Sequence, residues 1–232
     1  MSVDFRIMGV KQRREKFILN MLNSLSMDET IVSYDEDGLP KNAMRNARKT
    51  WTKPTKHSHI CVMQDDLELC DNFKEIVEEC AKQFPNCVFS FYNSRLRWED
   101  KAKDTPYLKV NGCGMYGQII MMPTSFVEPL FFWCDKVYGR DYPHDDTVIG
   151  FFCSVHNIPV MTTIPCIVQH LGCSNSVLGY NNKNKVSKVY QKDVGLEVFK
   201  TNKFGITKYI PNTEIPPKGG YKTGRLVKLS EV

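Results

Sequence analysis

The sequence predicts an α/β protein with a mostly parallel central sheet that is flanked by helices. Three observations lead to this prediction. Short apolar strands alternate with amphipathic helices over residues 5–92, acidic residues follow directly on the strands, and a chain of 232 residues suits one such domain. Ligands of parallel sheets bind where the strands end, so these acidic residues lie where a site is expected.

The N-terminal half is read from the spacing of its apolar residues. Strands are expected at 5–10, 30–34, 60–63 and 87–92. The first intervening helix follows a basic turn, the second is opened by Pro40, and the third has Asp71 as its N-cap. The apolar faces of these helices are Phe17, Ile18, Met21, Leu22 and Leu25; Ala43, Met44, Ala47 and Trp51; and Phe73, Ile76, Val77, Cys80, Ala81 and Phe84.

The C-terminal half is more mixed. Residues 93–111 are expected to form a polar loop, followed by a strand at 118–122 and a helix that contains residues 126–131. Asp145 and Asp146 open a further helix, and two short strands at 160–163 and 166–169 lead to His170. From Gly172 onward the chain is rich in Gly, Asn, Lys and Pro, so irregular and partly mobile structure is expected.

Composition places the chain among ordinary globular proteins. The formal charge of +5 and the pI of about 8.6 suit an anionic substrate such as a nucleotide sugar, and permit nucleic acid. None of the nine cysteines forms a CxxC pair, so we expect reduced core thiols and a reducing compartment. Because no signal peptide and no membrane-spanning apolar run is seen, the expected location is cytoplasmic, in the host cytoplasm if the protein is viral.

The sharpest feature is Gln64-Asp65-Asp66, at the end of an apolar strand. Two adjacent carboxylates repel each other unless they are paired, and a divalent cation with oxygen ligands relieves that repulsion. The same cation can neutralise the charge that builds on a departing nucleotide. The alternative is a pair of acidic turn residues that cap the next helix.

A second acidic pair and a late histidine are further candidates. Asp145 and Asp146 suit the start of a helix, but a second carboxylate also indicates a general base or an acceptor clamp. His170 is either a structural residue or a metal ligand. Arg13 and Arg48 are candidates for phosphate contacts from their charge and placement alone.

A glycine-rich segment, with glycines at 112, 114 and 117, follows no strand that opens into a helix. It therefore does not predict a dinucleotide fingerprint. Its glycines allow either a close approach of backbone to a ligand or a plain turn.

The order of these features resembles the GT-A fold of glycosyltransferases, especially small phage- and virus-encoded members, and more distantly the lipopolysaccharide-type family with its Glu-Asp-Asp motif. The resemblance covers about residues 5–176. It implies a single GT-A-type (Rossmann-like) domain over residues 1–176. Residues 177–232 would then be an irregular basic C-terminal extension, packed on or near the active site.

The resemblance also implies roles for individual residues. Asp35 would contact the nucleotide, as would Val10, Gln64 with Asp65, and the loop that contains Gly114. Asp66 would be the principal metal ligand, with Gln64 departing from the acidic residue usual at its position. Asp145 and Asp146 would match the acidic motif on the acceptor side, one of them as base, and His170 would complete the metal site.

The implied activity is that of a hexosyltransferase that depends on Mn²⁺ or Mg²⁺. Its donor would be a nucleoside-diphosphate sugar, first of all a UDP-sugar such as UDP-glucose, and its acceptor a hydroxymethylated DNA base or a glycan. Two alternatives remain open: a nucleotide-sugar hydrolase on the same scaffold, and a non-enzymatic module that binds nucleic acid. A nucleotidyltransferase is disfavoured because the turn after the first strand, residues 10–14, has no glycine run.

Overall fold

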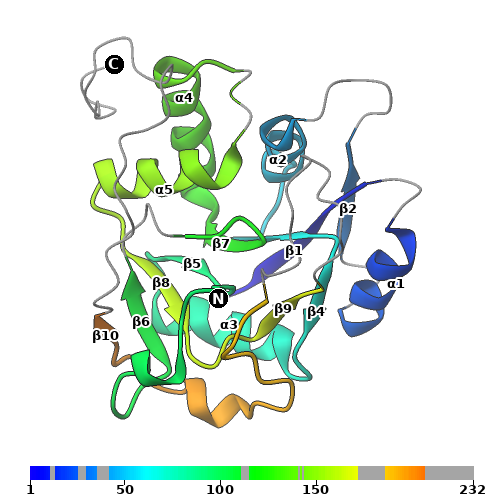
Figure 1. Ribbon diagram of the computed structural model, residues 1–232. Helices are drawn as coiled ribbons and strands as arrows, with labels where there is room; N and C mark the ends of the chain where they lie inside the picture. Colours follow the sequence, from blue (N-terminus) through cyan, green and yellow to red (C-terminus); the bar gives the residue numbers. More distant parts are fainter. Residues whose placement is uncertain are drawn as a thin grey trace.

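The computed structural model describes residues 1–10, 14–25, 30–35, 42–110, 115–140, 142, 144–171 and 186–206 (Figure 1). The strands are β1 (Val3–Gly9), β2 (Ile31–Tyr34), β3 (His59–Gln64), β4 (Leu67–Leu69), β5 (Val88–Ser90), β6 (Tyr107–Val110), β7 (Ile119–Pro123), β8 (Val160–Thr163), β9 (Val168–His170) and β10 (Gly205–Ile206). The α-helices are α1 (Glu15–Ser24), α2 (Ala43–Trp51), α3 (Phe73–Gln83), α4 (Val127–Val137) and α5 (Asp145–Val155). Short 3₁₀ helices are η1 (Trp98–Asp100), η3 (Thr124–Phe126) and η4 (Leu196–Phe199).

In the described part of the chain, eight strands form one sheet in the order β10-β6-β8-β5-β7-β3-β1-β2. The pairs β1–β2, β1–β3, β5–β8 and β6–β10 are parallel. Strand β7 runs antiparallel to both β3 and β5, and β6 runs antiparallel to β8. Within this sheet, parallel pairs outnumber antiparallel ones, which confirms the predicted α/β class. Strands β4 and β9 form a second, antiparallel sheet that holds the candidate site.

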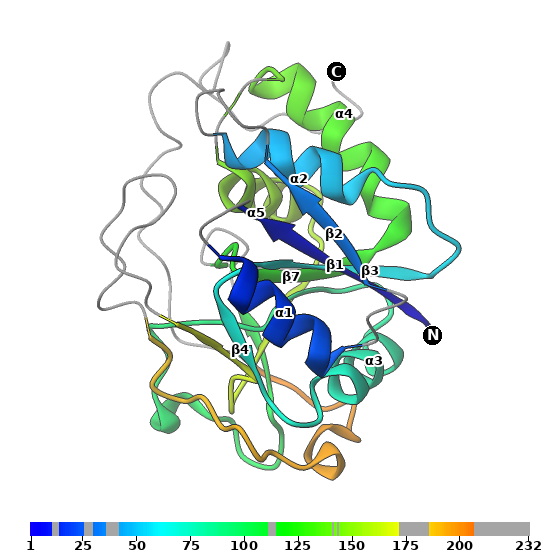
Figure 2. The same cartoon turned by 90° about the vertical axis from the view of Figure 1, so that its right-hand side faces the viewer.

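Helices cover both faces of the large sheet. Figure 2 shows α2, α4 and α5 on one side, and α1 and α3 on the other. Alternate residues of β3 serve the two layers: Cys61 and Met63 pack with α1 and α3, whereas Ile60 and Val62 pack with α2, α4 and α5. A strand buried on both faces reads as a continuous apolar run, so β3 was recognisable from sequence.

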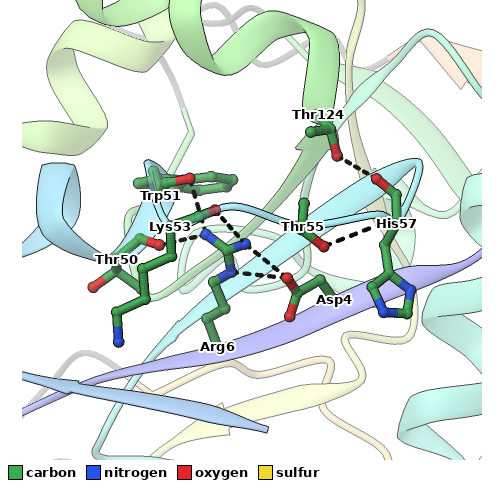
Figure 3. A network of polar contacts seen from close by, with 8 residues as sticks. All are labelled: Asp4, Arg6, Thr50, Trp51, Lys53, Thr55, His57 and Thr124. Atoms are coloured by element: carbon green, nitrogen blue, oxygen red, sulfur yellow. Dashed lines mark hydrogen bonds and ion pairs between the residues drawn. The ribbon is translucent and has the colours of Figure 1, made fainter. Parts of the chain in front are cut away.

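Strand β1 carries one buried ion pair on the face that meets α2. Arg6 is fully buried and Asp4 is nearly so, with Arg6 Nη2 2.7 Å from Asp4 Oδ2. The same guanidinium donates to the carbonyl oxygens of Thr50, Trp51 and Lys53 at 2.5–2.9 Å, as Figure 3 shows. The last carbonyls of a helix have no partner within the helix and favour a nearby positive charge. Arg6 therefore ties the end of α2 to β1.

Two helix starts differ from the sequence prediction. Helix α2 begins at Ala43, where the side chain of Asn42 accepts the backbone N–H of Arg45 at 3.0 Å; Pro40, which was expected to open this helix, lies outside the described residues. The N-cap of α3 is Asn72 rather than Asp71. In both cases the helix starts nearer to its first buried apolar residue than the sequence predicted. Packing of the apolar face, rather than the cap residue alone, sets where the helix begins.

The predicted polar loop at 93–111 is wrong in part, because it contains η1 and β6. Residues 186–206 contain η4 and β10 and are otherwise irregular, and a few buried side chains anchor them to the rest of the fold. Phe199 is completely buried, Tyr107 Oη donates to its carbonyl at 2.8 Å, and β10 pairs with β6 at the sheet edge. Tertiary packing orders these segments, which have little apolar periodicity of their own.

Each of the seven described cysteines carries a free thiol, as predicted; Cys113 and Cys173 lie outside the described residues. Burial raises the pKa of Cys134 and of Cys166 to about 11, so these thiols are unreactive core residues. Among the helices that the structure describes, none combines the length and the apolar character that a membrane span requires.

Candidate functional site

The chain passes from the large sheet to the small one through Asp65 and Asp66. Strand β3 ends at Gln64 and β4 begins at Leu67. Strand β4 pairs with β9 in a register that sets Leu67 opposite His170. His170 Nε2 therefore lies 3.2 Å from Asp66 Oδ2, and the backbone N–H of Leu171 donates to the Asp66 carbonyl at 3.0 Å. The structure thus brings together the two residues predicted as metal ligands.

Arg14 joins both carboxylates of the acidic pair. Its Nη1 atom lies 2.7 Å from Asp65 Oδ1 and 2.7 Å from Asp66 Oδ2. All three side chains are less than 10% exposed, so these are buried ion pairs. The sequence prediction named the neighbouring Arg13, which lies outside the described residues, and missed Arg14. The available signal was position: Arg14 is the residue just before α1, and helix starts point toward the ends of parallel strands.

Asp65 and Asp66 have different surroundings. Asp65 Oδ2 accepts the backbone N–H of Val10 at 2.6 Å, so this carboxylate fixes the end of β1. Val10 is predicted to contact the nucleotide sugar, and its backbone N–H is used by Asp65. Burial raises the pKa of Asp65 above its ordinary value, although Arg14 and the Val10 N–H oppose it. Burial also acts on Asp66, but the hydrogen bond and charge of His170, together with Arg14, outweigh it and lower its pKa.

The two carboxylate oxygens of Asp66 differ in their hydrogen-bond partners. Asp66 is 1% exposed, and its Oδ1 atom is buried without a hydrogen-bond partner among the described residues. A buried carboxylate oxygen in that condition costs free energy unless a ligand supplies a positive charge or a donor. A divalent cation fits this requirement. The described residues hold no group of three His, Cys, Asp or Glu side chains around one point, so Asp66 and His170 would supply two ligands.

The second acidic pair lies at the same end of the sheet. Gln64 N donates to Gln118 O at 2.8 Å, which places the start of β7 beside the end of β3. Gly117 packs so closely on Asp146 that a Cβ atom at this glycine would lie 2.9 Å from the Asp146 Cβ. The glycine is therefore needed for close approach. Gly112 and Gly114, the rest of the predicted loop, lie outside the described residues.

Asp145 and Asp146 differ in access. Asp145 is buried, and burial with the neighbouring Asp146 charge raises its pKa to about 7. Asp146 is half-buried, and its Oδ1 accepts the backbone N–H of Thr147 at 2.7 Å. Only Asp146 of the two is exposed enough to meet an acceptor directly.

Two further predicted residues lie apart from the acidic pair. Asp35 follows β2 beside the end of β1: its backbone N–H donates to Gly9 O at 3.1 Å, and its carboxylate pairs with Arg45 Nη2 at 2.8 Å. This position suits the predicted contact to a nucleotide. Arg48 instead contacts α4, where it forms an ion pair with Asp135 and lies over the Phe131 ring. Charge and placement alone predicted a phosphate contact for Arg48, because they carry no information on how α2 packs against α4.

An aromatic pair supports the histidine. The Tyr92 ring centroid lies 6.0 Å from that of His170, and Tyr116 meets Tyr92 edge-on at 5.6 Å. Tyr92 is completely buried, and its ring packs beside the imidazole of His170. Sequence analysis assigned no role to these tyrosines, because their contact with His170 depends on how β5 and β9 pack.

The fold and site define an α/β protein with a buried carboxylate–imidazole pair and a second acidic pair at the ends of its central strands. No family model and no curated protein matches the chain. Solved structures do. A Drosophila β1,4-galactosyltransferase 7 mutant in complex with manganese, UDP-Gal and xylobiose aligns over 81% of this chain and 71% of its own, with 11% identity and a TM-score of 0.35.

Two other solved structures align similarly. The inositol-1-phosphate CTP transferase from T. maritima aligns over 68% of this chain and 65% of its own, with 10% identity and a TM-score of 0.36. A glycosyltransferase involved in glycosylation of the major capsid of PBCV-1 covers 62% of this chain and 72% of its own, with 8% identity and a TM-score of 0.30. Alignments at this level carry no inference about activity, which therefore has to come from the chemistry of the site.

Proposed function

We propose that this chain is a glycosyltransferase that depends on a divalent cation and takes its sugar from a nucleoside-diphosphate sugar. One observation carries the proposal. Asp66 is a buried carboxylate with His170 on one oxygen and no described hydrogen-bond partner on the other. Most buried carboxylate oxygens in protein interiors have a hydrogen-bond partner. Asp66 instead has the properties of a metal ligand.

The cation would be held by Asp66 and His170. A carboxylate oxygen together with an imidazole nitrogen suits manganese better than magnesium, which prefers oxygen ligands alone. When bound, such a cation neutralises the negative charge that develops on a departing nucleoside diphosphate. Asp35 and the end of β1 would face the nucleoside, because both lie at neighbouring strand ends on the same edge of the sheet.

The second acidic pair would serve the acceptor. In the transfer step, the bond between the sugar carbon and the diphosphate oxygen breaks, and a bond forms from that carbon to the acceptor oxygen. The acceptor hydroxyl loses a proton, and Asp146, the more exposed of the two carboxylates, would take it. A hydroxymethylated DNA base and a glycan are the two acceptor classes to test. Residues 207–232 of the basic C-terminal extension lie outside the described residues.

The proposal is tested by thermal unfolding with a panel of nucleoside diphosphates and nucleotide sugars, UDP-sugars first, each with and without manganese. A ligand at 100 times its Kd stabilises the native state by about 2.7 kcal/mol. We expect a rise in Tm that needs both the metal and one nucleotide, and that is lost in Asp66→Ala. Folded protein that shows no shift with any nucleotide would contradict the proposal. Product analysis with the identified donor then separates transfer from hydrolysis.

The role of Asp146 gives a prediction of its own. Asp146→Asn keeps an oxygen for the Thr147 N–H but cannot take a proton. We expect kcat to fall by about 10²–10⁴-fold, the usual contribution of a general base. The Tm shift with metal and nucleotide should be unchanged. An Asp146→Asn enzyme with normal kcat would exclude this carboxylate as the base.

Asp145 predicts a pH dependence of stability. Its native pKa of about 7 lies above the ordinary value of 3.8, so between these values the native state binds more protons than the unfolded state. The free energy of unfolding should therefore fall as the pH rises through this window. Asp145→Asn removes the titrating group, so its advantage over wild type should be larger at about pH 8 than at about pH 5. Urea unfolding at both pH values measures this, and an equal difference at both would refute it.

A further inference from the structure

Arg14 lies directly beside the place in the site where a cation is needed. A single nitrogen of its guanidinium contacts one oxygen of Asp65 and one oxygen of Asp66, each at 2.7 Å. The Asp66 oxygen that it contacts is Oδ2, the same atom that faces His170 Nε2. Arg14 thus neutralises Oδ2 of Asp66, whereas Oδ1, which has no hydrogen-bond partner among the described residues, is left for a cation. It also supplies one positive charge to two buried carboxylates.

A metal on Asp66 and His170 would compete with this arrangement. Metal–ligand distances are about 2.0–2.3 Å, so an ion bound to Asp66 and His170 would lie within a few ångströms of Arg14. Two positive charges at such a separation repel strongly in a buried site. Arg14 also donates to Oδ1 of Asp65. The other oxygen of that carboxylate, Oδ2, accepts the Val10 N–H. The guanidinium can therefore leave Asp66 and remain on Asp65.

We propose that Arg14 is an internal counter-ion that exchanges with the metal: it neutralises Asp66 while the cation is absent and withdraws to Asp65 when the cation binds. This inference rests on the proposed function. Once withdrawn, the guanidinium is a donor at the same strand ends where a diphosphate would bind. Metal and nucleotide are then coupled through Arg14, because the metal releases Arg14 and the diphosphate gives it a new partner.

The coupling has a measurable consequence without any turnover. In the wild-type protein, manganese alone has to displace Arg14 and binds weakly, whereas UDP strengthens its binding. In Arg14→Gln, which retains a hydrogen-bond donor but not the charge, manganese meets no competitor. Coupling free energies between sites usually correspond to about 5- to 150-fold in affinity. We expect Arg14→Gln to bind Mn²⁺ alone at least about tenfold more tightly than wild type.

The experiment measures free Mn²⁺ by electron paramagnetic resonance while each full-length protein is titrated, with and without UDP. The proteins are wild type, Arg14→Gln, Arg14→Lys and Arg97→Met, which removes an exposed guanidinium that donates to carbonyls of its own loop. Arg14→Lys should resemble wild type because it keeps the charge, and Arg97→Met should match wild type. UDP should enhance Mn²⁺ binding strongly in wild type and weakly in Arg14→Gln.

Each outcome has a distinct meaning. If Arg14→Gln binds Mn²⁺ no more tightly than wild type, while wild type binds Mn²⁺ with UDP, the counter-ion role is overturned and the metal site stands. If neither protein binds Mn²⁺ under any condition, the metal site itself fails, and the proposed function fails with it. If Arg14→Gln melts early in a chelator, its Tm should rise with Mn²⁺ more than that of wild type does. An equal rise would also overturn the exchange.

Discussion

Replacing Asp66 by asparagine is expected to abolish most of the sugar transfer. The variant keeps the size of the side chain and one oxygen, but it loses the charge that would hold the cation beside His170. Removing electrostatic stabilisation of a developing negative charge usually costs about 10²–10³-fold in kcat, and loss of the cation should reach at least that range. Initial rates at saturating donor and manganese, with the donor found in the thermal panel, measure the effect.

A matched control separates the site from local structure. Asp71 lies just after β4, is 59% exposed, and pairs only loosely with Lys192 at 3.6 Å. Asp71→Asn makes the same chemical change a few residues away, and its rate should equal that of wild type. If Asp66→Asn retains wild-type kcat with manganese present, Asp66 does not hold a cation that acts in the reaction. If both variants lose activity equally, the effect arises from the β4 segment as a whole.

The central elements of the fold could be predicted because their signals are local. Strand β3 is apolar on both faces, and the stripe of α3 repeats at helical spacing, so neither depends on knowing its partners. Strands β6 and β10 were missed for the opposite reason. The first lies in a polar stretch, and the second has only two residues, Gly205–Ile206. Each forms because it can hydrogen-bond to a strand already in the sheet: β6 to β8, and β10 to β6.

The site residues also differ in whether a local sequence signal could reveal them. The position of Asp65 and Asp66 followed from a rule about strand ends, which needs only the end of one strand. The contact of His170 with Asp66 depends on the register between β4 and β9, and that register pairs residues about a hundred positions apart. Arg14 is one residue from Arg13, so charge and composition could not separate them. The direction of its side chain is set by where α1 begins.

The largest effect on stability is expected at Arg6, which sequence patterning passed over as one residue of an apolar strand. Arg6→Met keeps most of the side-chain volume but leaves the nearly buried Asp4 without its partner. It also removes the donors for three carbonyls at the end of α2. Removing one partner of a buried ion pair usually costs about 3–5 kcal/mol of unfolding free energy. Urea denaturation measures this loss directly.

The control is the ion pair between Arg48 and Asp135, which is only partly buried. Arg48→Met removes the same charge, and breaking exposed pairs usually costs about 0–1 kcal/mol. A double variant, Asp4→Leu with Arg6→Met, should recover part of the loss, since an intact buried pair is often replaceable by apolar residues. It should not recover all of it, because the carbonyls of Thr50, Trp51 and Lys53 still lack their donors. Full recovery would mean that Arg6 serves only to neutralise Asp4, and a loss no larger than that of Arg48→Met would mean that α2 does not depend on Arg6.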